Sequence, residues 1–396
     1  MDHFTGAHDV ATILQPDIPV ALNRPHLVRA AARFFVSRFP GDILYAVKAN
    51  PSPWVLQALW DEGVRMFDVA SVNECALVRG LFPQAELAFM HPVKSRQAIT
   101  RAYREFGVRV FALDTPDELE KIRAATDGAQ DLTLVVRLRV SNDMAGLKLE
   151  AKFGTHGAEA EALLRATRQA ARTMGVSFHV GSQCMDPRAW RTAMAEASEL
   201  LVQAAVVVDI VDVGGGFPSR YPGMNPPPMQ TFIDEIERVF DAMPVPMNCR
   251  LWAEPGRALV AEGTSILARV DLVKGDALYL NDGSYGNLFD ATHVKWRYPV
   301  RLVRTGGEAP SARVKGFRLY GPTCDSMDTA EGPFELPVDI REGDYVEFGM
   351  LGAYGVAMAT RFNGYGETLD VSVAEMPYAS MFPAVAAPVT AGAVRG

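Results

Sequence analysis

The chain has 396 residues, of which 48% are hydrophobic and 22% charged, a composition that excludes wholesale disorder and allows two domains. Its formal net charge of −8 argues against a nucleic-acid partner. The N-terminus lacks the features of a signal peptide, no apolar run reaches the ~18 residues of a membrane span, and the four widely spaced cysteines form no CxxC pair. We therefore expect a cytoplasmic protein with no membrane partner, no disulfide framework and no metal site.

Eight short apolar runs alternate with helical segments over the first two-thirds of the chain. The runs cover residues 43–48, 65–70, 87–91, 109–114, 132–140, 176–182, 210–216 and 250–254. Residues 95–107, 115–126 and 187–204 have helical spacing. Eight strands separated by helices over roughly 230 residues predict a TIM-like (β/α)8 barrel, which we place at residues 24–262.

Local signals mark the ends of several of these helices. Thr115-Pro116 and Asp186-Pro187 are suitable pairs of N-cap and first helical residue. Glycines follow helical segments at positions where a left-handed terminating residue is needed: Gly63, Gly107, Gly128 and Gly175. The competing layout, an open doubly wound sheet, usually carries a Gly-rich dinucleotide loop after its first strand, and none follows residues 43–47. This favours the barrel.

The alternation of apolar runs and helical segments ends at about residue 263. Short alternating strands follow, with EGD and GG turns between them and no long helix. We expect an all-β domain, a β-sandwich or β-barrel, over residues 263–396, joined by the N-terminal residues 1–23. Residues 384–396 are small, apolar and interrupted by Pro and Gly, and we expect them to be poorly ordered.

Polar residues and glycines end several of the barrel runs. They are Lys48, Asp68, Arg137, His179, Ser182, the triplet Gly214, Gly215 and Gly216, Glu254 and Arg257. Each has an ordinary explanation, such as a solvated lysine, a helix N-cap or a satisfied core imidazole. The carboxyl ends of parallel barrel strands surround one mouth, however, and active sites of such barrels lie there.

The glycine triplet and the EPGR sequence predict a phosphate site. Adjacent glycines let backbone N–H groups turn toward an anion, phosphate sites recur after strands seven and eight, and arginine suits phosphate. Together with a strand-end lysine they suggest pyridoxal 5′-phosphate (PLP). Lys48 would form the imine, as a neutral amine favoured by partial burial. Glu254 could hold the ring nitrogen protonated and His179 could stack on the ring.

At these residues the chain resembles the barrel-type PLP-dependent decarboxylases, the alanine-racemase-fold family that includes ornithine, lysine and diaminopimelate decarboxylases. The motifs YAVKANP, FDVASVNE, FHVGSQC, DVGGGFP, EPGRALV, NDGSYG and GPTCDSMD occur in the family's order. The resemblance implies an imine at Lys48, support from Asp68 and Arg137, and a stacked His179. It assigns the phosphate to Ser182, Gly214, Gly215, Gly216, Arg257 and Tyr354, and the pyridine nitrogen to Glu254.

The same resemblance implies the substrate site and the assembly. Cys324 would reprotonate the substrate carbon after CO2 leaves, Asp325 would receive a distal ammonium with Asp290 alongside, and Tyr285 would also contact the substrate. In the family the loop with Cys324 and Asp325 enters the site from the partner subunit, which implies a homodimer with shared sites. Asp325 could instead cap a turn and Asp290 could be a solvated loop charge.

Asp325 after Cys324, together with Asp290, favours a terminal amine, as in ornithine or lysine, and dual use is plausible; we expect L-ornithine, giving putrescine for polyamine biosynthesis. Diaminopimelate decarboxylases usually have Glu after the cysteine, and the arginine decarboxylases of this fold are expected to be much longer. Lysine differs from ornithine by one methylene, worth only ~1–3 kcal/mol. Two departures are Phe289, where Tyr is often found, and Gln183, where Gly is frequent; His91 receives no role. The alternatives are a lysine or meso-diaminopimelate decarboxylase, or a related binding protein without activity.

Overall fold

Eight parallel strands close into a barrel in the computed structural model of the chain, which describes residues 1–141, 144–147, 152–294 and 296–382. The order around the barrel is β11-β12-β3-β4-β5-β6-β7-β9. Their bounds are β3 (Asp42–Ala46), β4 (Met66–Val69), β5 (Glu86–Phe89), β6 (Val110–Leu113), β7 (Thr133–Arg137), β9 (Thr173–Ser177), β11 (Ile210–Asp212) and β12 (Arg250–Ala253). Each strand overlaps one of the eight predicted runs, and the predicted barrel is confirmed.

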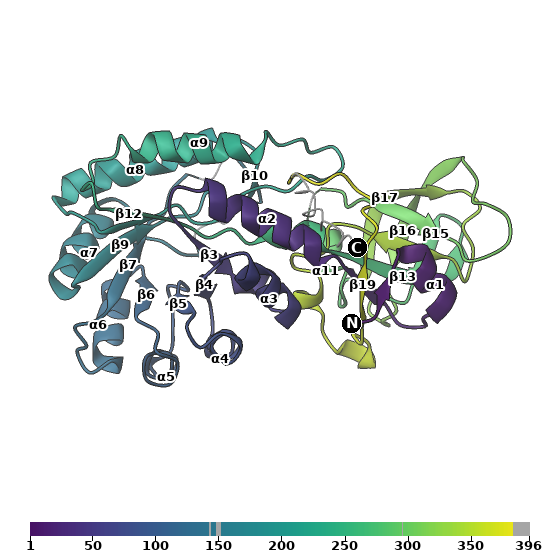
Figure 1. Cartoon of the computed structure of the whole chain (residues 1–396), viewed down its shortest axis with the longest axis horizontal. Helices are drawn as coiled ribbons and strands as arrows, with labels where there is room; N and C mark the ends of the chain where they lie inside the picture. Colours follow the sequence, from purple (N-terminus) through teal and green to yellow (C-terminus); the bar gives the residue numbers. More distant parts are fainter. Residues whose placement is uncertain (142–143, 148–151, 295, 383–396) are drawn as a thin grey trace, which may run out of the picture.

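Helices surround the barrel strands (Figure 1). They are α2 (Pro25–Arg38), α3 (Pro53–Asp61), α4 (Val72–Leu81), α5 (Arg96–Phe106), α6 (Pro116–Ala125), α7 (Gly157–Ala170), α8 (Arg188–Ala204), α9 (Met229–Phe240) and α10 (Arg257–Val260). Thr115 caps α6 as predicted, because its side chain accepts a hydrogen bond from the N–H of Glu118. Gly63, Gly107 and Gly128 have positive φ angles beyond helix ends, also as predicted.

One of the predicted helix ends is wrong. Gly175 lies inside β9, where a Cβ would come 3.1 Å from the Cβ of Ile210, so this glycine allows neighbouring strands to pack and ends no helix. The predicted start of α8 agrees with the structure to within one residue, because α8 begins at Arg188 and Pro187 already has helical φ and ψ angles of −57° and −25°. Asp186 accepts a hydrogen bond from the N–H of Arg188 at 2.9 Å, which is the bond expected of a capping residue before Pro187.

The interior of the barrel follows a period of two residues. One side chain from each of seven strands belongs to a single buried cluster inside the barrel: Leu44, Met66, Ala88, Ala112, Val135, Ile210 and Trp252. Residues two positions further along a strand face the same way. At the carboxyl end these positions are Ala46, Asp68, Met90, Asp114, Arg137, Asp212 and Glu254. An apolar layer therefore supports a largely polar layer at the mouth.

The second part of the molecule is a nine-stranded sheet beside the barrel (Figure 1). It contains β1 (His3–Phe4), β2 (Val20–Asn23), β13 (Thr264–Lys274), β14 (Ala277–Leu280), β15 (Val300–Val303), β16 (Val314–Tyr320), β17 (Thr329–Pro337), β18 (Tyr345–Phe348) and β19 (Leu369–Val373). A mostly β second part was predicted and is confirmed. β2 pairs with both β13 and β19, so N-terminal residues lie in this sheet. The domain boundaries at 24–262 and 263–396 stay predictions, and residues 383–396 lie outside the described residues.

Several smaller elements of the described chain lie outside the barrel and the large sheet, including four 3-10 turns. A two-stranded sheet pairs β8 (Ala145–Leu147) with β10 (Ser182–Cys184) near the barrel mouth. Two further helices are α1 (Ala7–Leu14) and α11 (Phe289–His293). Within the described ranges, none of the helices has the length and apolar character that crossing a bilayer requires.

Candidate active site

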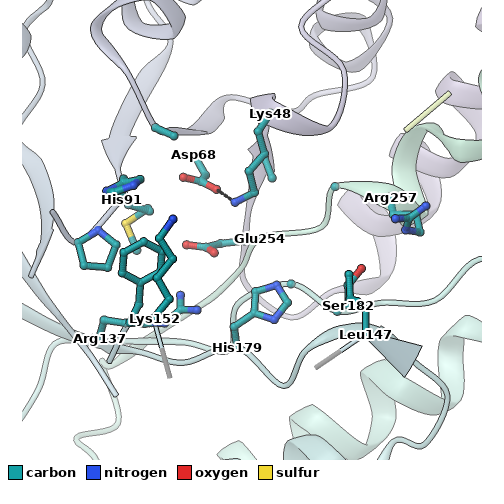
Figure 2. Close-up of a pocket in the computed structure, with 18 of the residues that line it drawn as sticks. Lys48, Asp68, His91, Arg137, Leu147, Lys152, His179, Ser182, Glu254 and Arg257 are labelled. Carbon is teal, nitrogen blue, oxygen red and sulfur yellow. Dashed lines mark hydrogen bonds and ion pairs between the residues drawn. The ribbon is translucent and has the colours of Figure 1, made fainter. Parts of the chain in front are cut away.

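A cavity of about 670 Å³ opens at the carboxyl ends of the barrel strands. Eleven of the residues that the sequence singled out line it: Lys48, Asp68, Arg137, His179, Ser182, Gly215, Gly216, Glu254, Arg257, Asp290 and Tyr354. Lys48, Asp68 and Glu254 point toward one another in Figure 2, with Arg257 on one side of them and Arg137 on the other. The strand ends that lie far apart in the sequence therefore converge on one site.

Lys48 lies on a 3-10 turn, Val47–Ala49, directly after β3, and its side chain enters the cavity. Its Nζ lies 3.2 Å from Oδ2 of the buried Asp68, while 48% of the Lys48 side chain is exposed. The Asp68 carboxylate raises the pKa of Lys48, and this attraction outweighs the opposing effect of burial. The expectation that partial burial keeps the amine neutral is therefore wrong. The free side chain is an ammonium ion that must lose a proton before it can act as a nucleophile.

Glu254 follows β12 and is buried, and its Oε1 has no hydrogen-bond partner. Burial raises the pKa of this carboxyl well above its usual value, with further contributions from Asp212 and Asp68. Asp212 is the first residue of the DVGGGFP motif, but it was assigned no role from the sequence. Its place at the site could have been predicted, because Asp212 is the one charged residue in the apolar run IVDV and shares the inward face with Ile210.

The glycine triplet follows β11 and packs too closely for any side chain. Gly214 and Gly216 have φ angles of +65° and +105°, which favour glycine. A Cβ on Gly214 would lie 2.0 Å from the carbonyl oxygen of Phe178, and one on Gly215 would lie 2.7 Å from that of Glu254. The segment can therefore be occupied by glycine only, because the neighbouring chain leaves no room for a Cβ. Gly215 and Gly216 line the cavity, whereas Gly214 does not.

His179 is held in one orientation at the edge of this segment. Its Nδ1 accepts a hydrogen bond from the N–H of Gly181 at 3.0 Å. A Cβ on Gly215 would lie 3.0 Å from Nε2, so the glycine makes room for the ring. Burial, followed by the charges of Arg137 and Lys48, lowers the pKa of His179 well below its usual value. The imidazole is thus neutral, which suits a flat surface on which an aromatic ring can stack.

Arg257 begins α10 and is buried among aromatic side chains. Its Nη1 donates to Oδ2 of Asp290 at 2.6 Å, to the hydroxyl of Tyr221 at 2.9 Å and to that of Tyr298 at 3.3 Å. Its Nε is buried without a partner. An arginine that lines a cavity with an unused N–H group can still donate a hydrogen bond to a phosphate oxygen. Asp290 is already a counter-ion of Arg257, so its predicted contact with a distal ammonium stays a prediction.

Tyr354 comes from the chain segment that follows β18 and reaches the barrel mouth. Its backbone has a φ of +56°, and its N–H donates to the carbonyl oxygen of Ala49 at 2.9 Å. Asn50 adds a second link, because its Nδ2 donates to the carbonyl oxygen of Gly352 at 2.8 Å. These bonds fix the segment against the turn that carries Lys48, so the second part of the molecule supplies one wall of the site.

Ser182 lines the cavity from β10, and the residue after it explains one departure from the family resemblance. Gln183 has a φ of +54°, a conformation that glycine adopts without strain. The buried Gln183 side chain accepts a hydrogen bond from the N–H of Ser219 at 3.0 Å through Oε1. Its Nε2 donates to the carbonyl oxygen of the same residue. The amide therefore holds the strained backbone in place.

The side of the cavity away from Arg257 is formed by residues to which sequence reasoning gave no role. His91 and Lys152 line it (Figure 2), and so does Phe153. The His91 and Phe153 rings meet edge to face, with centroids 5.0 Å apart. Burial is the main cause that lowers the pKa of His91. Arg137 lies on this side too, so positive charge predominates here.

Cys324, Asp325 and Tyr285 do not line this cavity, although they form a cluster of their own. Cys324 is exposed, whereas the three other cysteines are buried. The Cys324 Sγ lies 3.2 Å from Oδ1 of Asn363, which also accepts from the Cys324 N–H. Tyr285 donates to Oδ2 of Asp325 at 2.6 Å. None of the three lies in the cavity of its own chain, so their predicted roles toward the substrate stay predictions.

Asp328 joins the two loops that carry this cluster. Its Oδ1 accepts from the N–H of Ser284 at 2.7 Å, and its Oδ2 accepts from the hydroxyl of Thr323 at 2.7 Å. A Cβ at Gly283 or Gly321 would lie 2.2 Å from Oδ1 of Asp328. The glycines of NDGSYG and GPTCDSMD therefore let one buried carboxylate hold both loops, and it orients the segment that presents Cys324 and Asp325.

The donor set fits PLP on three structural observations. Glu254 keeps an unpartnered buried oxygen and Arg257 keeps an unpartnered buried donor. Gly215 and Gly216 bring backbone without side chains to the wall of the cavity. These features offer a partner for a ring nitrogen, a cation for a phosphate and space for its oxygens, and Lys48 lies within the same cavity.

Comparison with known proteins gives one family and several close relatives. The model of the family described as "Pyridoxal-dependent decarboxylase, pyridoxal binding domain" matches residues 26–261. The lysine/ornithine decarboxylase of Selenomonas ruminantium is 32% identical over 336 residues, covering 82% of this chain and 81% of the relative. The diaminopimelate decarboxylase of Actinosynnema pretiosum is 32% identical over 366 residues, covering 87% and 82%.

Solved structures agree with these relatives. An SrLDC variant in complex with PLP aligns with a TM-score of 0.81 and 27% identity, over 94% of this chain and 96% of that one. The arginine decarboxylase of Paramecium bursaria Chlorella virus bound to agmatine aligns with a TM-score of 0.80 and 25% identity, over 92% and 98%. That chain is of similar length, so the expectation that arginine decarboxylases of this fold are much longer is wrong.

Proposed function

The chain belongs to the pyridoxal-dependent decarboxylases, and within this family we propose that its preferred substrate is L-ornithine, which it converts to putrescine and CO2. At the coarser level it is a PLP-dependent carboxy-lyase of the group that acts on basic amino acids. Asp325 after Cys324, in place of the Glu usual in diaminopimelate decarboxylases, supports a substrate with a terminal ammonium, and this holds for ornithine and lysine alike. We choose ornithine of the two because relatives that are ornithine decarboxylases or lysine/ornithine decarboxylases recur among the matches.

PLP, when bound, supplies the electron sink that takes up the electron pair left by CO2. Lys48 would bind the aldehyde carbon of the cofactor, and Asp68, 3.2 Å from the Lys48 Nζ, would favour the charged form of this nitrogen. Glu254 would hold a proton at the ring nitrogen. The neutral His179, whose orientation is fixed by the N–H of Gly181, would supply a flat surface for the ring.

The anchor for the phosphate lies on the Arg257 side of the cavity. We assign it to the backbone of Gly214, Gly215 and Gly216, to the hydroxyls of Ser182 and Tyr354, and to Arg257. The Asp290 carboxylate and two tyrosine hydroxyls orient the guanidinium, so the cation is in place before an anion arrives.

Cys324 and Asp325 act on the substrate from a partner subunit in this proposal. Neither residue lines the cavity of its own chain, whereas a proton donor and an ammonium acceptor are needed beside the cofactor. A homodimer with two shared sites meets this need. Within it, Cys324 returns a proton to the substrate carbon and Asp325, oriented by Tyr285, binds the distal ammonium. We also propose the cytoplasm as the compartment, because Cys324 has to stay reduced.

A side-by-side measurement of CO2 release tests the substrate. Ornithine, lysine, diaminopimelate and arginine are supplied at equal concentrations, and kcat/KM is compared. We expect ornithine to be used best, with lysine within about 10–200-fold because one methylene is worth only ~1–3 kcal/mol. A higher kcat/KM for diaminopimelate or arginine would refute the ornithine assignment. Borohydride reduction followed by peptide mapping locates the covalent bond, which we expect at Lys48.

A diaminopimelate decarboxylase is the second candidate. Its substrate carries a second carboxylate, which requires a cation in the site. Lys152 lines the cavity on the side opposite Arg257 (Figure 2) and could serve that carboxylate. The same CO2 assay separates the two candidates. If the protein is a diaminopimelate decarboxylase, Lys152→Gln should lower kcat/KM for diaminopimelate and leave kcat/KM for the other three substrates unchanged.

A further inference from the structure

Asp212 and Glu254 lie on neighbouring barrel strands with their side chains on the same inner face. Strand β11 pairs with β12 in parallel, with Asp212 opposite Trp252. Ile210 and Trp252 belong to the buried cluster inside the barrel. Asp212 follows Ile210 by two positions and Glu254 follows Trp252 by two, so both carboxyl groups point into the barrel mouth.

Both carboxyl groups are short of hydrogen-bond partners. Asp212 is 0% exposed and Glu254 4% exposed. Asp212 Oδ1 accepts a hydrogen bond from the N–H of Gly214 at 2.8 Å. In the described part of the chain, no donor group reaches Oδ2 of Asp212 or Oε1 of Glu254. The two side chains are within hydrogen-bonding reach of each other. Two carboxyl groups can form that bond only when one of them carries a proton.

Negative charge is in excess around the pair without that proton. Asp68 from β4, Arg137 from β7 and Lys48 from the turn after β3 act on the two carboxyls, and His179 is neutral. These groups are two cations and three carboxyls, and Glu74 adds a further carboxyl near Lys48 and Asp68. A proton on the pair reduces the excess of negative charge, which the burial of Asp212 and Glu254 favours. In agreement, burial raises the pKa of Asp212 to about 6 and raises that of Glu254 well above its usual value.

We propose that Asp212 and Glu254 share one proton in the free protein and that this proton moves to the ring nitrogen of PLP when the cofactor binds. The inference rests on the proposed contact between Glu254 and the ring nitrogen. When the cofactor enters with its ring nitrogen unprotonated, one O–H bond of the pair breaks and one N–H bond forms, so no proton is taken from solvent for this step. Asp212 is a positioning residue: it acts through Glu254, and its negative charge then stabilises the proton on the ring.

Infrared difference spectroscopy at neutral pH tests the transfer, because the C=O stretch of a protonated carboxyl is separate from that of a carboxylate. The free protein should show this band, and it should disappear when PLP binds. The control cofactor is 1-deaza-PLP, which has a CH in place of the ring nitrogen and cannot accept the proton. With 1-deaza-PLP the band should persist.

Two variants assign the band to the pair. Asp212→Asn and Glu254→Gln, which keep size and hydrogen bonding, should each lack the band in the free protein. Asp282→Asn removes a buried carboxyl outside the cavity and should leave the PLP-sensitive band unchanged. The wild-type comparison of PLP with 1-deaza-PLP needs no variant, so the test stands even if one of them does not fold.

The outcomes separate this inference from the function on which it rests. If the free wild-type protein lacks the C=O band of a protonated carboxyl, the proposal of a shared proton is wrong, whatever the position at which PLP binds. A band that is present and survives PLP binding would overturn the transfer and contradict the proposed position of Glu254. Equal loss of the band with PLP and 1-deaza-PLP would also overturn the transfer, because the loss would then need no ring nitrogen.

Discussion

The Nζ of Lys48 lies 3.2 Å from Oδ2 of Asp68, and this ion pair joins the ends of two neighbouring barrel strands. Asp68 is 3% exposed, so its charge acts on Lys48 with little screening by solvent. The pair keeps the free lysine protonated, and it therefore controls the pH at which Lys48 can bind an aldehyde.

The first prediction concerns this pH dependence. Asp68 raises the pKa of Lys48, so the neutral amine appears only at higher pH. Asp68→Asn removes the charge, and the rate of imine formation with PLP should reach its plateau about 1–3 pH units lower. Stopped-flow absorbance across pH measures the shift. Asp61→Asn, which removes an exposed carboxylate that pairs with Arg29, is the control and should leave the profile unmoved.

Replacement of Cys324 should separate cofactor binding from proton return. Cys324→Ala should bind PLP with unchanged affinity, because Cys324 does not line the cavity of its own chain. Loss of a general acid should lower kcat by about 10²–10⁴-fold, and some product should be misprotonated. Turnover and product analysis check both effects. Cys249→Ala, at a buried cysteine, is the control, and wild-type turnover in Cys324→Ala would place the acid elsewhere.

Asp325→Asn should weaken the binding of the diamino acid more than it slows the chemistry. A hydrogen bond to a charged group is worth ~1.5–3 kcal/mol, so KM should rise by about 10–150-fold with a smaller change in kcat. Steady-state kinetics with ornithine separates the two constants. Asp276→Asn serves as the control, because its surface carboxylate pairs with Lys315. Unchanged kinetics in Asp325→Asn would remove the basis for choosing a terminal amine.

Mixed dimers test the shared sites. A Lys48→Ala chain and a Cys324→Ala chain are each inactive or nearly so, but a heterodimer has one site with an intact Lys48 and an intact partner Cys324. Random reassortment should recover about a quarter of the wild-type activity. Differently tagged chains allow heterodimers to be purified before the assay. No recovery in purified heterodimers would mean that both residues serve the same site of one chain.

Gly215→Ala should reduce PLP affinity through a steric effect. The new Cβ would lie 2.7 Å from the carbonyl oxygen of Glu254 and 3.0 Å from His179 Nε2, so backbone or ring has to move. We expect the Kd for PLP to rise at least about tenfold, which corresponds to ~1.4 kcal/mol. Fluorescence titration measures it. Gly80→Ala, in α4 with no atom within 4 Å of the added Cβ, should have no effect, and equal affinity in both variants would contradict the proposed phosphate site at the glycine triplet.

Much of this molecule could be predicted from the order of residues along the chain. Strand-end polar residues such as Lys48, Asp68 and Glu254 were predicted to share one mouth, because parallel strands in a barrel end at the same side. The glycine triplet was recognised as a place where side chains are excluded, and the structure shows that no Cβ fits there, because neighbouring backbone lies too close; the predicted contact of the triplet with an anion stays a prediction. These are local rules, and they depend on neighbours in sequence.

Other features depended on contacts between residues far apart in the chain. The charge of Lys48 is decided by Asp68 across a strand pair, and Asp290 is bound to Arg257, 33 positions away. Asp212 could be seen in the sequence but gained meaning only beside Glu254. Gly175 ends no helix because Ile210 packs against it.

Periodicity and turn chemistry fixed which residues form the barrel and which of them face its mouth, because side-chain direction alternates along a strand whatever lies around it. Protonation states and pairings were decided by the tertiary structure. Electrostatic energy depends on the distance between groups and on how much solvent screens them, and both quantities exist only once the chain has folded.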